Sequence, residues 1–96
     1  MTTPHVRAHD MTITYCTGGM VKVDLDSRTY ELPNSYEMVK ALIHTFGPFS
    51  HSQDVHYAAA LLTLEVHHPN RQRTTDDQAI ITRVNRQRNT ALTQTV

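Results

Sequence analysis

Residues 11–32 read MTITYCTGGMVKVDLDSRTYEL, and apolar side chains alternate with polar ones along most of this segment. A period of two residues is typical of a strand with one buried face. Thr17-Gly18-Gly19 and Asp26-Ser27-Arg28 interrupt the alternation as turns, because glycine supplies the positive φ angles of tight turns. The pattern predicts an antiparallel meander with one solvated face. Its three expected strands are residues 11–16, 21–26 and 29–32.

Two segments after the strands carry the start signals of helices. Asn34 and Glu37 fit a capping box, and Gly47 is an expected stop, which predicts a helix over residues 34–46. Thr75 with Gln78 fits a second capping box that opens a C-terminal helix.

A further helix lies between these two. It is expected to begin at Ser50 or Ser52 and to end near His68, and its broad apolar surface predicts that it is the most buried of the three. The order β-β-β-α-α-α predicts an α+β fold with three helices packed on one face of a small sheet. The expected core residues are Ile13, Tyr15, Val21, Val23, Leu25, Leu32, Val39, Ile43, Phe46, Ala59, Leu62, Val66, Ile81 and Val84.

Length and composition bound the organisation of the chain. Ninety-six residues, 39% of them hydrophobic, are typical of one globular domain. We expect a polar N-terminal arm at residues 1–10 and a single α+β domain over residues 11–96. No apolar run is long enough to span a membrane or to act as a secretory signal. The single Cys16 cannot form an internal disulfide, so we expect a protein of the cytoplasm.

Charge is unevenly distributed along the chain. Residues 1–70 hold four basic residues against seven acids, whereas residues 71–96 hold five arginines against two aspartates. Arg83 and Arg86 are three residues apart and share a helix face, to which the preceding loop can add two more arginines. Arginine suits the recognition of phosphate and carboxylate groups. The predicted partner-binding residues are Arg71, Arg73, Arg83 and Arg86.

Other candidate chemical groups do not form a recognisable catalytic or metal site. His5 and His9 have the spacing of a helical zinc pair but fall in the expected arm, and His51 and His56 are five residues apart. Cys16 precedes two glycines but has no histidine placed near it by the sequence. We therefore expect no metal, no cofactor and no catalytic activity.

In size and in the order of its elements, the chain resembles the small proteins of phages and mobile elements, anti-CRISPR inhibitors among them. Those proteins are compact α+β domains that act by occupying a surface. The resemblance implies a non-catalytic protein-binding module, an inhibitor of a larger nucleoprotein complex. The alternative is a small nucleic-acid-binding regulator that uses the arginine-rich C-terminal helix. An enzyme ranks behind both hypotheses.

Overall fold

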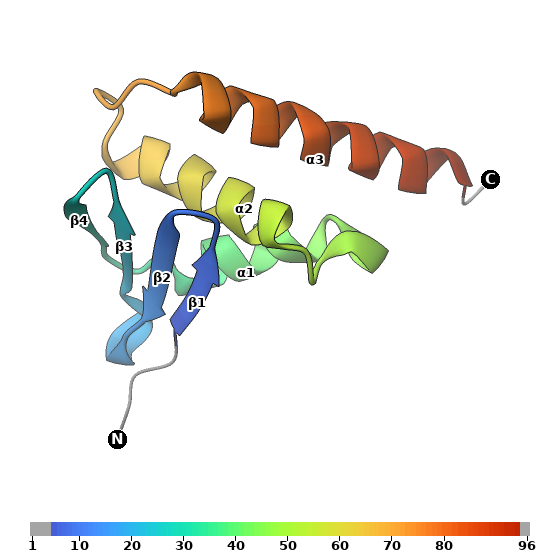
Figure 1. Cartoon of the computed structure of the whole chain (residues 1–96). Helices are drawn as coiled ribbons and strands as arrows, with labels where there is room; N and C mark the ends of the chain where they lie inside the picture. Colours follow the sequence, from blue (N-terminus) through green and yellow to red (C-terminus); the bar gives the residue numbers. More distant parts are fainter. Residues whose placement is uncertain (1–4, 95–96) are drawn as a thin grey trace.

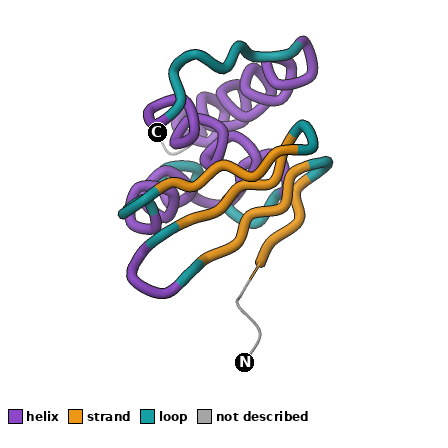
Figure 2. Tube along the Cα trace, turned by 90° about the vertical axis from the view of Figure 1, so that its left-hand side faces the viewer, coloured by secondary structure: helices purple, strands orange, loops and turns teal. Residues whose placement is uncertain are grey.

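Three helices lie on one side of an antiparallel sheet, and the protein is therefore an α+β structure (Figures 1 and 2). The computed structural model describes residues 5–94, with the side chains of residues 5–90. The sheet has the strand order β1-β2-β3-β4. The strands are His5–Ala8 (β1), Met11–Tyr15 (β2), Val21–Leu25 (β3) and Arg28–Leu32 (β4).

The prediction of three strands was wrong, because a fourth strand, β1, lies inside the segment expected to be a polar arm. β1 pairs with β2 so that Val6 lies opposite Ile13 and Ala8 opposite Met11. Ala8 is fully buried even though alanine has little intrinsic preference for strands. Residues 5–8 therefore form a strand because they pair with β2. The first four residues of the expected arm lie outside the described residues.

The sheet separates an apolar face from a polar one. Ile13, Val21 and Val23 are fully buried on the side of the helices. The other face carries Lys22, Asp24, Glu31 and the threonines of β2 and β4, as the alternation predicts.

Helix α1 (Tyr36–His44) confirms the expected first helix, but the helix begins differently. Asn34 has a φ of 56° and belongs to the preceding turn, so the predicted capping box does not form. Ser35 occupies the N-cap position, and its hydroxyl instead lies 2.8 Å from Nε2 of His67. The backbone N–H of Ser35 donates to the carbonyl of Gly19 at 3.0 Å. The start of α1 is therefore fixed to two other parts of the fold.

Helix α2 (Gln53–His67) occupies the centre of the molecule, as its composition predicts (Figure 1). The hydroxyl of Ser52 caps it by accepting from the N–H of Val55 at 3.1 Å. α2 contacts β1 and β4 on one side, α1 beside it, and α3 (Thr75–Gln94) on its remaining side. Within residues 5–94, no helix combines the length and the apolar character that a membrane span requires.

The capping box of α3 forms one residue earlier than predicted. Thr74 and Asp77 make it: the Thr74 hydroxyl accepts from the Asp77 N–H at 3.1 Å, and the Asp77 carboxylate accepts from the Thr74 N–H at 3.0 Å. This shift brings a carboxylate, rather than the amide of Gln78, to the buried side of the helix.

The buried line of α2 follows the prediction at Ala59, which is fully buried, and departs from it further along the helix. Val66 is 62% exposed and Leu62 is only partly buried. Ala58, Leu61 and Leu64 are fully buried instead. Both sets of residues have helical spacing, and the sequence does not show on which side α3 covers the helix.

The carboxylate of Asp77 connects several elements in the interior. Its side chain is 1% exposed and accepts hydrogen bonds from the hydroxyl of Tyr57, from the Thr74 N–H and from Nη1 of Arg71 at 2.9 Å. Arg71 is itself only 8% exposed and also donates to Asp26 at 2.7 Å. The network thereby joins α2, the start of α3, the loop between them and the turn between β3 and β4.

The two charges of this network support each other. Burial alone would raise the pKa of Asp77, but hydrogen bonds from Tyr57, Thr74 and Arg71 outweigh burial and lower it. Burial opposes the charge of Arg71, yet its bonds to Asp26 and Asp77 raise its pKa. Because the pKa of Asp77 is lowered in the folded state, its stabilisation is present above the ordinary aspartate pKa. That stabilisation is lost as pH falls through the lowered value.

We expect Arg71→Ala to lower the free energy of unfolding by about 3–5 kcal/mol, since it leaves the Asp77 carboxylate buried without its cation. Arg73→Ala is the matched control. Arg73 pairs with Glu65 at 2.7 Å near the surface, so its loss should cost about 1 kcal/mol or less. Urea unfolding of both variants measures the difference, and equal costs would contradict this role of Arg71.

Two adjacent leucines test the orientation of α2. Leu61→Ala should cost about 2–5 kcal/mol, because it empties a fully buried site. Leu62→Ala should cost less, because part of the Leu62 side chain already contacts water. Thermal and urea unfolding compare the two variants. A larger loss at Leu62 would mean that α2 is rotated relative to α3.

Candidate partner-binding cleft

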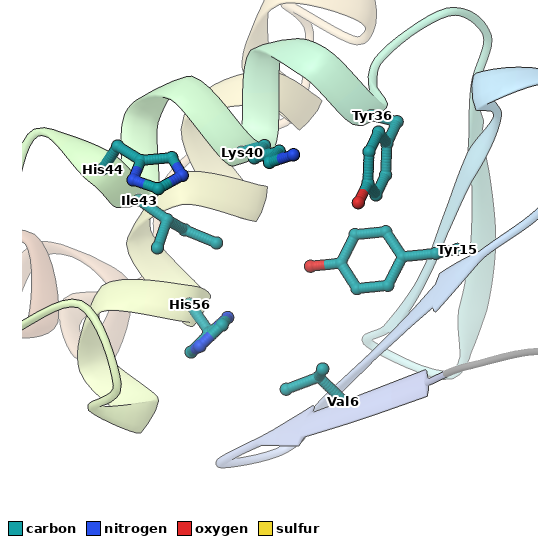
Figure 3. A pocket seen from close by; sticks show the side chains of 7 residues that line it. All are labelled: Val6, Tyr15, Tyr36, Lys40, Ile43, His44 and His56. Atoms are coloured by element: carbon teal, nitrogen blue, oxygen red, sulfur yellow. The ribbon is translucent and has the colours of Figure 1, made fainter.

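A cleft of about 280 Å³ opens between the helix-facing side of the sheet and helix α1 (Figure 3). β1 and β2 form one wall, and α1 with the first turns of α2 forms the other. Its lining residues, which define the tyrosine–lysine cleft, are Val6, Tyr15, Tyr36, Lys40, Ile43, His44 and His56.

The surface of the cleft is mostly apolar and aromatic. The rings of Tyr15 and Tyr36 meet edge to face with 5.5 Å between their centroids. Figure 3 shows both hydroxyls pointing into the space between sheet and helix, with Val6 and Ile43 on opposite sides of it. Tyr15 and Ile43 were expected in the core, but they are only partly buried because they form these walls.

Positive charge lies at one side of the cleft. The ammonium group of Lys40 is 5.8 Å from the centroid of the Tyr36 ring, within the range of a cation–π contact. Among the described residues that line the cleft, none is acidic. The cleft therefore offers a cation beside an apolar surface, with no carboxylate in its lining to neutralise it.

Two titratable groups of the cleft are shifted toward their neutral forms. Burial lowers the pKa of His56, and the charge of His51 lowers it further. Burial raises the pKa of Tyr15, and the nearby Tyr36 phenol raises it further. Nδ1 of His56 is buried without a hydrogen-bond partner among the described residues. This unpaired buried nitrogen is consistent with the lowered pKa, because a charged ring would leave a further buried donor without a partner.

Local structure explains how the cleft forms. Tyr36, Lys40 and His44 recur every four residues and so lie along one side of α1. Ser35, anchored to Gly19 and His67, holds the first turn of that helix next to the end of β2. The spacing of the α1 residues was visible in the sequence, but their meeting with Tyr15 depends on the tertiary structure.

The structure divides the four predicted arginines into two pairs. Arg71 and Arg73 are committed within the chain, the first to Asp26 and Asp77 and the second to Glu65. Arg71 in particular is nearly inaccessible, so we remove it from the candidate surface.

Arg83 and Arg86 lie together on the open face of α3. They border a shallow groove with Gln78 and Thr82. Arg83 is 54% exposed and pairs with Asp54 at 3.3 Å. These two arginines remain available as a surface feature, separate from the seven residues of the cleft.

The histidines and the cysteine were the other candidates for a chemical site. Nε2 of His9 contacts the Asp54 carboxylate at 2.6 Å, which ties the β1–β2 turn to α2. Within residues 5–94, no three histidine, cysteine or acidic side chains come close enough together to hold a metal ion. Cys16 is free and half-buried.

No protein-family model, curated protein or solved structure matches the chain. The role of the cleft therefore has to be argued from its geometry and its charge.

The pKa of His56 provides a test of the cleft in solution. We expect His51→Gln to raise it, because one of the two causes of the shift is removed, yet to leave it below the ordinary value because burial persists. NMR titration of the ring protons measures this. Since the neutral form is favoured in the folded state, the stabilisation is present above about pH 6.5 and is lost as pH falls through the lowered pKa.

His5→Gln is the control for that titration. His5 lies on the outer face of the sheet, opposite Thr14, and its replacement should leave the His56 titration unchanged. An unchanged His56 pKa in the His51 variant would contradict the described arrangement.

Proposed function

We propose that this protein is a non-catalytic binding module that holds a protein partner in the tyrosine–lysine cleft. The observation that carries the proposal is the combination of apolar walls, two tyrosine hydroxyls and one lysine, with no carboxylate among the described lining residues, in a single concave site. Tyrosine-rich concave sites of this kind are typical of interface anchors.

The chemistry of the lining favours binding over catalysis. A general acid–base mechanism needs titratable groups placed against a nucleophile or a second acid. The described lining offers no carboxylate, no serine and no cysteine beside its two histidines. These residues can fill space, stack, donate hydrogen bonds and attract an anion.

The same lining indicates the chemistry of the bound group. Val6, Ile43 and the tyrosine rings suit an apolar or aromatic side chain, and Lys40 attracts a carboxylate. The preferred group is therefore a bulky apolar side chain with an acidic residue next to it.

Magnitudes favour a macromolecule over a small ligand. Burial of one large apolar side chain contributes about 1.5–3 kcal/mol. A micromolar complex needs about 8 kcal/mol, so contacts outside the cleft must supply the remainder. A protein partner has the additional surface to do so. The narrower hypothesis of an inhibitor of a nucleoprotein complex remains a prediction that concerns the identity of this partner.

The two lysines of the chain form a matched pair for testing the cleft. Lys40→Glu reverses the charge in the cleft, whereas Lys22→Glu makes the same change on the outer face of the sheet. Partners are first captured from lysate by the parent protein, with and without nuclease, and are then purified. Calorimetry should show that Lys40→Glu weakens direct binding by about 30-fold, an energy of about 2 kcal/mol at a central contact.

Lys22→Glu should leave that affinity within about twofold, since exposed substitutions away from an interface have small effects. Lys40→Glu should keep the parent melting temperature, whereas Lys22→Glu should lower it slightly, because it places a second carboxylate opposite Glu31. Equal affinity of the two variants would exclude the cleft as the binding site.

The second candidate, nucleic-acid binding, rests on the pairing of Arg83 and Arg86 along the open face of α3. Its distinguishing property is a steep loss of affinity with salt, in proportion to the phosphates neutralised. If Arg83→Glu with Arg86→Glu abolishes a salt-sensitive, nuclease-sensitive interaction and Lys40→Glu does not, α3 is the binding element.

A further inference from the structure

The edge of the sheet next to the cleft is open. Within the described strands, β1 pairs with β2 alone, so its other edge faces away from the sheet. Alternate residues of an edge strand turn their N–H and C=O groups outward, unpaired. β1 therefore presents backbone donors and acceptors to which another extended chain can bind.

Val6 links this edge to the tyrosine–lysine cleft. It belongs to β1 and it also lines the cleft, on the side of the sheet that faces the helices (Figure 3). A strand added to β1 would lie about 4.8 Å away, and its alternate side chains would project on the same side as Val6. One of those side chains would enter the cleft.

The side chains on the outer face of β1 set a second requirement for the added strand. His5 and Arg7 alternate with Val6 and are exposed on the outer face of the strand. Opposite charges at cross-strand positions stabilise a sheet, and like charges destabilise it. An added strand should therefore carry acidic residues at its outward positions.

From this placement we infer that the partner binds as an extended acidic segment that adds a fifth strand to β1, with an apolar or aromatic side chain in the cleft. The inference rests on the proposed function and specifies the kind of partner. Backbone hydrogen bonds then supply the contacts outside the cleft, and alternate side chains supply specificity, as in other strand-addition complexes.

A second copy of the chain fits this edge less well. Self-pairing of β1 would place Arg7 and His5 next to the same basic residues of the second copy.

The other edge strand of the sheet, β4, is less suited than β1 to strand addition. Its inward-facing Tyr30 already packs against His68, with 5.2 Å between the ring centroids. Arg28 stacks on the same Tyr30 ring.

The test uses a short capped peptide in which glutamate alternates with phenylalanine and valine, titrated to millimolar concentration. Reductive methylation with ¹³C-formaldehyde labels the primary amines, and among the lysines it gives one resonance for Lys40 and one for Lys22. Binding should shift the Lys40 signal and leave Lys22 in place. Amide spectra should show shifts and slowed hydrogen exchange in residues 5–8 and no change in β4.

Two N-methylated versions of the peptide separate strand addition from side-chain binding alone. Methylation of one alternating set of amides removes the donors that face β1, and methylation of the other set removes donors that face away. One version should lose about tenfold or more in affinity, since several hydrogen bonds are lost together, and the other should bind like the parent peptide.

Charge reversal supplies a second variant that leaves the fold intact, since Arg7 is exposed. Arg7→Glu should weaken the binding of the glutamate peptide and strengthen the binding of a peptide with lysine in place of glutamate.

If both N-methylated versions bind like the parent peptide, the peptide occupies the cleft without joining the sheet. Strand addition then fails, while the proposed function stands.

Two other outcomes overturn strand addition. The first is the absence of any shift in residues 5–8 at millimolar peptide. The second is a dimer, detected by sedimentation, whose formation protects the β1 amides, because it assigns the edge to a second copy. Neither affects the calorimetry of Lys40→Glu with a purified partner, so the two proposals fail separately.

Discussion

The position of the helices depends on one buried carboxylate. Asp77 lies where α2, α3 and the sheet meet, and a charge at that depth is tolerated only when its oxygens are satisfied. Tyr57 of α2 satisfies them together with Arg71 and Thr74, which both lie in the loop before α3. Asp26 then holds the other side of Arg71 from the sheet. The geometry of this network therefore sets how α3 covers α2.

The cleft depends on a different anchor, at the N-terminal end of α1. Ser35 contacts the β2–β3 connection through its N–H and α2 through its hydroxyl, and Tyr36 follows directly. Because Ser35 is held through both its backbone N–H and its hydroxyl, the first turn of α1 is positioned so that the Tyr36 ring meets Tyr15. A site built on such supports is preorganised, and preorganisation reduces the entropy that binding must overcome.

The sequence predicted the architecture better than the site. Strong alternation in residues 11–32 and the punctuation around α1 and α2 identified most elements, since periodicity and capping are local properties. β1 was missed because its alternation is short and ends in Ala8, which is buried only in the folded structure, where β1 pairs with β2 and contacts α2. Arg71 was assigned to the surface because its partner Asp26 is 45 residues away. The cleft draws on four separate elements, and no local pattern joins Val6 or Tyr15 to Lys40.

The central position of α2 also has a consequence for the folding of a nascent chain. Residues 57–61 of α2 are buried in succession, on every side of the helix, and α3 provides part of that cover. A ribosome releases the chain in order, so α2 emerges before the segment that shields it. Until α3 docks, the side chains of Tyr57 and Leu61 are partly exposed to water, and the Asp77 carboxylate lacks its buried hydrogen-bond partners. The interval before α3 docks is therefore the one in which the apolar surface of α2 is open to chaperones and to self-association.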